Sequence, residues 1–171
     1  QVVAWVYRNI RRHGGDPGRI YVSGHSAGAI LAASVAVKSE WTAALKLPRT
    51  VIKGAIPVSA SYDLRSLTSV TNYVPDPGKR AEASPLLNVD APSDTIVGVG
   101  SPEPYVEGSK ALVARIQERG ARARLIVLEG LDHAQTVAAL GDAETPLVRA
   151  MIEMIAGGWK SSSPPAAVIV P

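Results

Sequence analysis

Apolar positions follow two different patterns along this chain, and the two patterns alternate. Short runs rich in β-branched or aromatic residues predict strands at residues 19–23, 51–58, 95–100 and 124–128. Apolar residues at helical spacing predict helices at residues 1–12, 29–37, 106–119 and 144–156. Strands that alternate with helices indicate an α/β fold, in which helices cover both faces of a mostly parallel sheet.

Glycine and proline mark the ends of these elements and the irregular parts of the chain. Gly14-Gly15-Asp16-Pro17 stop the first predicted helix. Residues 72–92 contain several prolines and no clear period, and we interpret this segment as part of a lid. We expect one α/β domain at residues 1–157, followed by a flexible, serine- and proline-rich tail at residues 158–171.

Length and composition narrow the class of protein. The 171 residues suit a single globular domain, since 46% are hydrophobic and only 19% are charged. The net charge is +3 and the arginines are scattered among acidic residues, so we expect no nucleic-acid partner. No apolar run is long enough to cross a bilayer, so we expect no membrane span and a cytoplasmic protein.

The residues that usually hold metals are scarce. The chain has no cysteine, which excludes disulfides, thiolate catalysis and thiolate metal sites. The three histidines, His13, His25 and His133, show no spacing typical of metal ligands. We therefore expect neither a metal nor another cofactor.

The stretch Gly24-His25-Ser26-Ala27-Gly28 fits the pattern G-x-S-x-G and lies between a predicted strand and a predicted helix. A strand, a sharp turn and a helix are the context in which this pattern presents a reactive serine. We expect a strained, exposed Ser26, with Gly24 and Gly28 placed where side chains would collide with neighbouring elements. The backbone N–H of Ala27, at the start of the helix, is the candidate donor of an oxyanion hole.

Two further residues suit the chemistry of a serine nucleophile. A serine hydroxyl attacks only when a neighbouring imidazole accepts its proton, and a carboxylate must then orient that imidazole. Glu103 and His133 follow the third and fourth predicted strands, at the edge where Ser26 also lies. We predict Ser26 as nucleophile, His133 as base and Glu103 as orienting acid.

Other polar residues near these positions leave alternatives. Asp94 and Asp132 also offer carboxylates for the role of the acid. Asp63 is a further candidate, although an aspartate before a short helix is more often a cap. We expect His25, inside the motif, to have a structural role.

The chain resembles the α/β-hydrolase superfamily, within it the esterase/lipase and arylformamidase-like branch known as the α/β-hydrolase fold-3 group. The resemblance covers residues 1–157 and rests on Gly14-Gly15-Asp16-Pro17-Gly18-Arg19-Ile20, Gly24-His25-Ser26-Ala27-Gly28, Tyr62-Asp63-Leu64 and Gly100-Ser101-Pro102-Glu103-Pro104. The order Ser26, Glu103, His133 is the superfamily's order of nucleophile, acid and base. Members commonly carry aspartate near the position of Glu103.

The resemblance implies a partial α/β-hydrolase fold that corresponds to the C-terminal portion, without the N-terminal strands. His13-Gly14-Gly15 looks like an esterase oxyanion loop but follows a helix, so we interpret it as a helix stop. The implied function is a serine hydrolase whose partner is a small-molecule carboxylic ester or N-formyl amide. The alternative is a non-catalytic ligand-binding homologue, or an inactive fragment that lacks the oxyanion loop.

Overall fold

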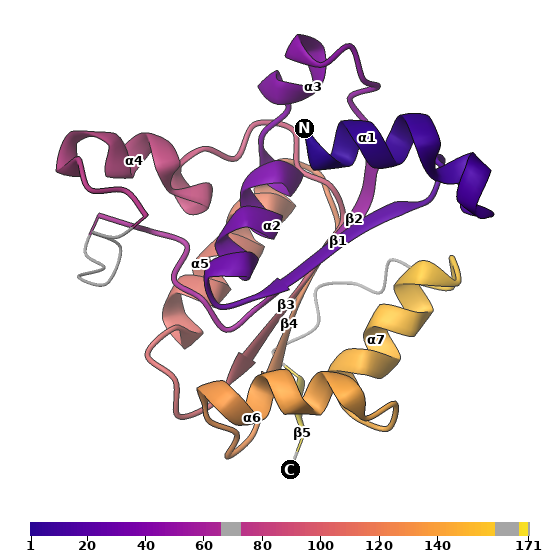
Figure 1. Ribbon diagram of the computed structural model, residues 1–171. Coiled ribbons are helices and arrows are strands. Elements are labelled where there is room, and N and C mark those ends of the chain that lie inside the picture. Colours follow the sequence, from indigo (N-terminus) through magenta and orange to yellow (C-terminus); the bar gives the residue numbers. More distant parts are fainter. Residues whose placement is uncertain (66–72, 160–167, 171) are drawn as a thin grey trace.

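The computed structural model describes residues 1–65, 73–159 and 168–170 and shows one β-sheet with helices on both faces (Figure 1). The strands are β1 (Ile20–His25), β2 (Ile52–Val58), β3 (Thr95–Gly100), β4 (Ala123–Leu128) and β5 (Val168–Val170). The α-helices are α1 (Val2–Asn9), α2 (Ala27–Val37), α3 (Glu40–Ala44), α4 (Arg80–Ala83), α5 (Val106–Glu118), α6 (His133–Ala138) and α7 (Pro146–Ile155), and 3₁₀ turns lie at Ile10–His13, Pro77–Lys79, Pro85–Leu87 and Ala139–Gly141. Each strand and helix predicted from the apolar pattern is present, with small differences at the ends.

The sheet is parallel throughout, and its strands lie side by side in the order of the sequence, β1-β2-β3-β4-β5. Strand β3 is buried along its whole length, and β2 exposes only Lys53. Continuous apolar runs of this kind are required where helices cover both faces of a parallel sheet. The predicted fold class is therefore confirmed.

The C-terminal segment differs from the flexible tail predicted for residues 158–171. Trp159 is buried in the core, and Val168–Val170 pair with β4 as strand β5. Two causes favour this pairing: β4 would otherwise leave a row of N–H and C=O groups without partners, and valine and isoleucine have high strand propensity. Residues 160–167 and 171, the remainder of the predicted tail, lie outside the described residues.

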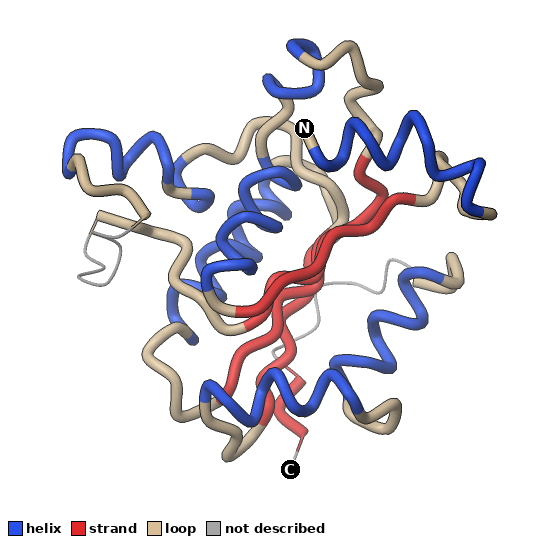
Figure 2. The backbone as a smooth tube through the Cα atoms, in the orientation of Figure 1, coloured by secondary structure: helices blue, strands red, loops and turns tan. Residues whose placement is uncertain are grey.

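The helices form two layers around the sheet (Figures 1 and 2). Helices α2 and α5 pack on one face, where Leu112 of α5 contacts the cluster around Val97. Helix α7 packs on the opposite face, where its Leu147 joins the cluster around Ile96. Helix α1 covers the first residues of β1 and β2 through a smaller cluster that contains Ala4. Neighbouring residues of β3 thus point to opposite cores, as the two-residue period of a strand requires.

The carboxyl ends of the strands meet at one edge of the sheet. His25 at the end of β1 lies beside Val58 of β2, and Gly100 at the end of β3 lies beside Leu128 of β4. The loops that leave these ends therefore start close together. This is the edge at which open α/β sheets bind ligands.

Helix α6, which was not among the helices predicted from the apolar pattern, begins just after β4. Asp132 accepts hydrogen bonds from the backbone N–H groups of Ala134 and Gln135, and the Gln135 side chain accepts one from the Asp132 N–H. This reciprocal capping box starts helix α6 at His133. His133 therefore occupies the first turn of a helix instead of a loop.

Candidate active site

Ser26 occupies a strained turn between β1 and α2. Its backbone has φ of 57° and ψ of −120°, in the left-handed half of conformational space that residues other than glycine rarely adopt. The Ser26 N–H donates to the Val58 carbonyl at 3.0 Å, which ties the turn to the neighbouring strand. The strand, turn and helix predicted around Ser26 are all present.

The two glycines of the motif have different roles. A Cβ at Gly24 would lie 2.3 Å from the Gly28 carbonyl oxygen, so a side chain at Gly24 is sterically excluded, as predicted. A Cβ at Gly28 would meet nothing within 4 Å, and the predicted collision there is wrong. The turn is crowded because the backbone of Gly28 approaches Gly24, while the outer side of Gly28 faces open space.

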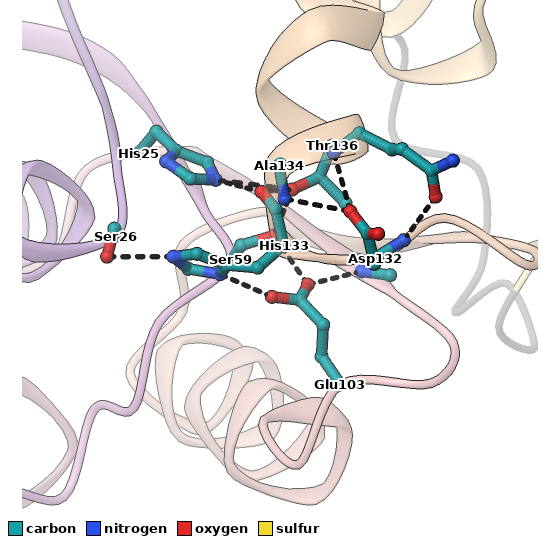
Figure 3. Close-up of polar contacts among 10 residues, drawn as sticks. His25, Ser26, Ser59, Glu103, Asp132, His133, Ala134 and Thr136 are labelled. Carbon is teal, nitrogen blue, oxygen red and sulfur yellow. Dashed lines mark hydrogen bonds and ion pairs between the residues drawn. The ribbon is translucent and has the colours of Figure 1, made fainter.

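His133 and Ser26 come together from distant parts of the chain. His133 Nε2 lies 3.0 Å from Ser26 Oγ, within hydrogen-bond distance (Figure 3). The capped first turn of α6 holds the His133 backbone. The His133 side chain keeps 44% of its surface exposed, so a substrate can reach the imidazole.

Glu103 lies on the other side of the imidazole. Its Oε1 lies 2.6 Å from His133 Nδ1, and its side chain is only 3% exposed. Its Oε2 accepts hydrogen bonds from the Gly100 N–H at 2.7 Å and from Ser59 Oγ at 2.6 Å. Three donors thus surround the buried carboxylate, which satisfies a charge that would be costly to bury alone.

These contacts define which imidazole nitrogen carries the proton. An ionised carboxylate only accepts hydrogen bonds, so Nδ1 of His133 must donate to Glu103. Nε2 then presents its lone pair to the Ser26 hydroxyl. The arrangement can draw a proton from Ser26, as a general base requires.

The alternative carboxylates lie elsewhere. Asp94 forms an ion pair with Arg122, at the end of β3 opposite to Glu103. Asp132 caps α6, as described above. Asp63 forms an ion pair with Arg65 at 2.7 Å, and the Arg65 hydrogen bond holds the pKa of Asp63 below its ordinary value. Of these carboxylates, only Glu103 forms a hydrogen bond with the imidazole of His133 in the described part of the chain.

The predicted oxyanion donor, Ala27, is the first residue of α2. The first N–H groups of an α-helix have no partner within the helix, and they point along its positive end. Ala27 follows Ser26 directly, so its N–H is next to any carbonyl oxygen that Ser26 attacks. This position suits the role proposed for Ala27.

Two polar side chains that were not predicted from the sequence, Ser59 and Thr136, connect these elements. Ser59 is buried and follows β2 directly, with φ of 57°. Thr136 on α6 is also buried, and it contacts both Ser59 and His25. The position of Ser59 at the carboxyl end of a strand was a usable signal, the same one that selected Glu103.

Tyr62 lies fully buried close to the acid. Its hydroxyl has no hydrogen-bond partner among the described residues. Burial raises the pKa of Tyr62 far above its ordinary value, and the negative charge of Glu103 raises it further. Tyr62 is thus a neutral side chain at every ordinary pH.

A mainly apolar cavity of about 360 Å³ begins beside the elbow. Along α2 it is lined by Ala27, Gly28, Ile30, Leu31, Ser34 and Lys38, and across from α2 by Leu64, Tyr73, Val74 and Ala83. Two of these lining residues, Leu31 and Tyr73, are large and mainly apolar side chains that are 70% and 67% exposed. Residues 73–92, the described part of the predicted lid, contribute to the wall opposite α2; residue 72 lies outside the described residues.

The described residues contain no cluster of three or more histidine, cysteine or acidic side chains with the geometry of a metal site. None of the helices in that part of the chain has both the length and the apolar character needed to cross a membrane.

Comparisons with known proteins agree with this architecture. Residues 1–74 match the model of the Carboxylesterase family. The chain is 31% identical over 142 residues to Esterase LipQ of Mycobacterium tuberculosis, an alignment that covers 71% of this chain and 34% of that protein. It is 31% identical over 150 residues to kynurenine formamidase of Danio rerio, with 80% of this chain and 49% of that protein covered. The chain thus spans between a third and a half of these relatives.

A solved structure shows the same fold. The structure of carboxyl esterase 2 from the mycorrhizal fungus Tuber melanosporum superimposes with a TM-score of 0.71 and 26% sequence identity. The match covers 90% of this chain and 57% of that protein.

Proposed function

We propose, from the premise that this chain belongs to the α/β-hydrolase superfamily, that it is a serine esterase with Ser26 as nucleophile. The observation that carries the proposal is the continuous hydrogen-bonded chain from Ser26 through His133 to the buried carboxylate of Glu103. Each of the three has the neighbour that its role requires. The relatives named as esterases support the same reaction class.

The chemistry follows from the position of each group. His133 Nε2 takes the proton of Ser26 Oγ as the oxygen attacks the ester carbonyl carbon. The Ala27 N–H stabilises the oxyanion of the tetrahedral intermediate, and Glu103 stabilises the imidazolium that forms at the same moment. His133 then gives its proton to the leaving alcohol, which leaves an acyl group on Ser26. A water molecule, deprotonated by His133, releases the acid and restores the serine.

The cavity beside Ser26 suggests the shape of the substrate. Its residues on α2 recur every three or four positions, so they form one face of the helix. With a rise of about 1.5 Å per residue, this face extends roughly 16 Å from Ala27 to Lys38. We infer that an extended apolar chain of the ester lies along α2, with Lys38 at the far end.

Cleavage of an N-formyl amide is a second candidate, because a relative is named kynurenine formamidase. The same nucleophile and base serve both reactions, and only the leaving group differs. A non-catalytic binding protein is the alternative from another class. The reactivity of Ser26 separates the enzymes from the binding protein.

The test uses covalent capture of the nucleophile. A fluorophosphonate probe should label Ser26, and Ser26→Ala should abolish both labelling and hydrolysis of p-nitrophenyl esters. Ser23→Ala is the matched control, because Ser23 is an exposed serine of β1 whose hydroxyl donates to the Ile56 carbonyl. A folded protein that the probe does not label would favour the binding protein, and faster cleavage of an aryl formamide than of any ester would favour the formamidase.

The substrate cavity has a separate test. Ser34→Phe places a bulky ring midway along the α2 face, so kcat/KM should fall for p-nitrophenyl octanoate and remain near wild type for the acetate. Ser34→Ala, which adds no bulk, is its control. Equal losses of kcat/KM for the two esters in Ser34→Phe would show that the apolar chain of the ester does not lie along α2.

A further inference from the structure

A buried cluster of polar side chains lies behind the proposed acid and is not used by the steps above. Thr136 Oγ1 is at its centre, 2.8 Å from Ser59 Oγ, 3.2 Å from His25 Nε2 and 2.9 Å from the carbonyl oxygen of His133 (Figure 3). Ser59 and Thr136 are both fully buried. Buried polar groups are retained only where their hydrogen bonds are satisfied, so the direction of each bond matters.

The directions follow from groups that can only accept. The ionised Glu103 carboxylate accepts, so the single hydroxyl proton of Ser59 points to Oε2. Ser59 Oγ also lies within hydrogen-bond distance of Thr136 Oγ1, at 2.8 Å, and the Thr136 hydroxyl donates to the His133 carbonyl at 2.9 Å. The His133 carbonyl also only accepts, and it takes the N–H at Nε2 of His25 at 2.9 Å. The His133 carbonyl, with two lone pairs, thus accepts from both Thr136 and His25, and Ser59 donates to Glu103.

The cluster closes a ring around the three proposed catalytic residues. From Glu103 the hydrogen bonds pass through Ser59 and Thr136 to His25, which is bonded covalently to Ser26. The ring also includes the backbone of His133, on the same turn of α6 as Thr136. The rings of His25 and His133 lie 4.5 Å apart, so the two imidazoles pack against each other as well.

We propose that Thr136 is a positioning residue that joins the elbow, the base and the acid into one unit. This inference rests on the proposed function of Ser26. Thr136 Oγ1 contacts Ser59 Oγ at 2.8 Å and so holds Ser59 beside Glu103, and its contact with His25 keeps α6 against the elbow. The distance from His133 Nε2 to Ser26 Oγ is thereby held at 3.0 Å. Loss of this orientation affects proton transfer and not the apolar cavity, which none of these side chains lines.

Valine and serine at position 136 provide a matched pair of variants. Thr136→Val keeps the shape and removes the hydroxyl, whereas Thr136→Ser keeps the hydroxyl. We expect Thr136→Val to lower kcat for p-nitrophenyl acetate by about tenfold, the effect of one lost hydrogen bond, with KM unchanged. Thr136→Ser should restore most of kcat. The proton NMR signal of His133 Nδ1–H, far downfield in the wild type, should broaden or shift in Thr136→Val alone.

His25→Phe provides a second route to the same conclusion, since it keeps the ring contact and removes the hydrogen bonds. Its loss of kcat should not add to that of Thr136→Val, because the two changes break one ring. Wild-type kcat in Thr136→Val, a change confined to KM, or full additivity with His25→Phe would overturn the positioning role. If the fluorophosphonate fails to label wild-type Ser26, the proposed function has failed instead. If the Thr136→Val protein does not fold, the test uses His25→Phe and Thr136→Ser. An unchanged kcat in His25→Phe would then refute the inference.

Discussion

Replacement of Glu103 by glutamine changes a single atom of the site from an acceptor to a donor. In the wild type, Oε2 receives the Gly100 N–H and the Ser59 hydroxyl, and Oε1 receives Nδ1–H of His133. Glutamine has only one side-chain oxygen, so it can accept at the position of Oε1 or of Oε2 but not at both. The Gly100 N–H is part of the backbone and cannot turn away, so the amide oxygen should take the place of Oε2.

The amide NH₂ group then faces His133 Nδ1, which must give up its proton and accept. The imidazole proton moves to Nε2, and Nε2 can no longer accept the proton of Ser26. In a serine protease, the corresponding change of tautomer lowers kcat by about 10⁴-fold. The opposite amide orientation would leave the Gly100 N–H unpaired, at a cost of about 1–3 kcal/mol, so we expect it to be the minor form. We predict a loss in kcat of about 10³- to 10⁴-fold, with little change in stability.

Two measurements test this prediction. Steady-state hydrolysis of p-nitrophenyl acetate gives kcat and KM, and long-range ¹H–¹⁵N NMR spectra identify the tautomer of His133. Glu107→Gln is the matched control, since Glu107 is an exposed carboxylate on α5 that pairs with Lys110. A Glu103→Gln protein with wild-type kcat, or with His133 still protonated at Nδ1, would refute the assignment of Glu103 as the orienting acid.

Two other predictions concern burial and close packing. Tyr62→Phe removes a buried hydroxyl that has no hydrogen-bond partner in the described part of the chain, so the melting temperature at pH 7 should stay the same or rise. The folded-state pKa of Tyr62 is raised above its ordinary value of 10.0, so the unfolded chain loses the hydroxyl proton at a lower pH than the folded chain does. The wild type should therefore lose stability as the pH rises above that value, and Tyr62→Phe should lose less. A lower melting temperature of Tyr62→Phe at pH 7 would show instead that the hydroxyl has a stabilising partner. Gly24→Ala places a Cβ 2.3 Å from the Gly28 carbonyl oxygen, and the strain should cost about 1–3 kcal/mol in urea unfolding and displace Ser26. Gly108→Ala on α5, where a Cβ meets nothing within 4 Å, should instead be neutral or stabilising; equal effects of the two variants would contradict the role of Gly24.

Local patterns were sufficient for most of the fold. The strands and the longer helices could be predicted because each leaves its own apolar period in the sequence, and alternation of the two element types implies a parallel sheet. The position of a residue after a strand was also informative. It placed Ser26, Glu103 and His133 at one edge of the sheet before any contact was known.

Short elements were not predictable in the same way. Helix α6 spans only His133–Ala138, too short to show a period, and it exists because Asp132 and Gln135 cap it. Strand β5 depends on β4 for its partner, and the strand propensity of only three residues was not sufficient to predict it. The choice among Glu103, Asp94 and Asp132 was open for a related reason. All three are carboxylates near strand ends, and the sequence does not say which of them reaches the imidazole of His133.

The sequence alone was sufficient to propose the type of chemistry, because the elbow around Ser26 is a local structure with a local signature. The tertiary structure alone decided which side chains complete the site. Ser59 and Thr136 are separated by 77 positions, and their 2.8 Å contact arises only after β2 and α6 pack together. A hydrogen bond between distant residues has no period and no propensity, since it depends on the distance between two atoms that only the assembled sheet brings together.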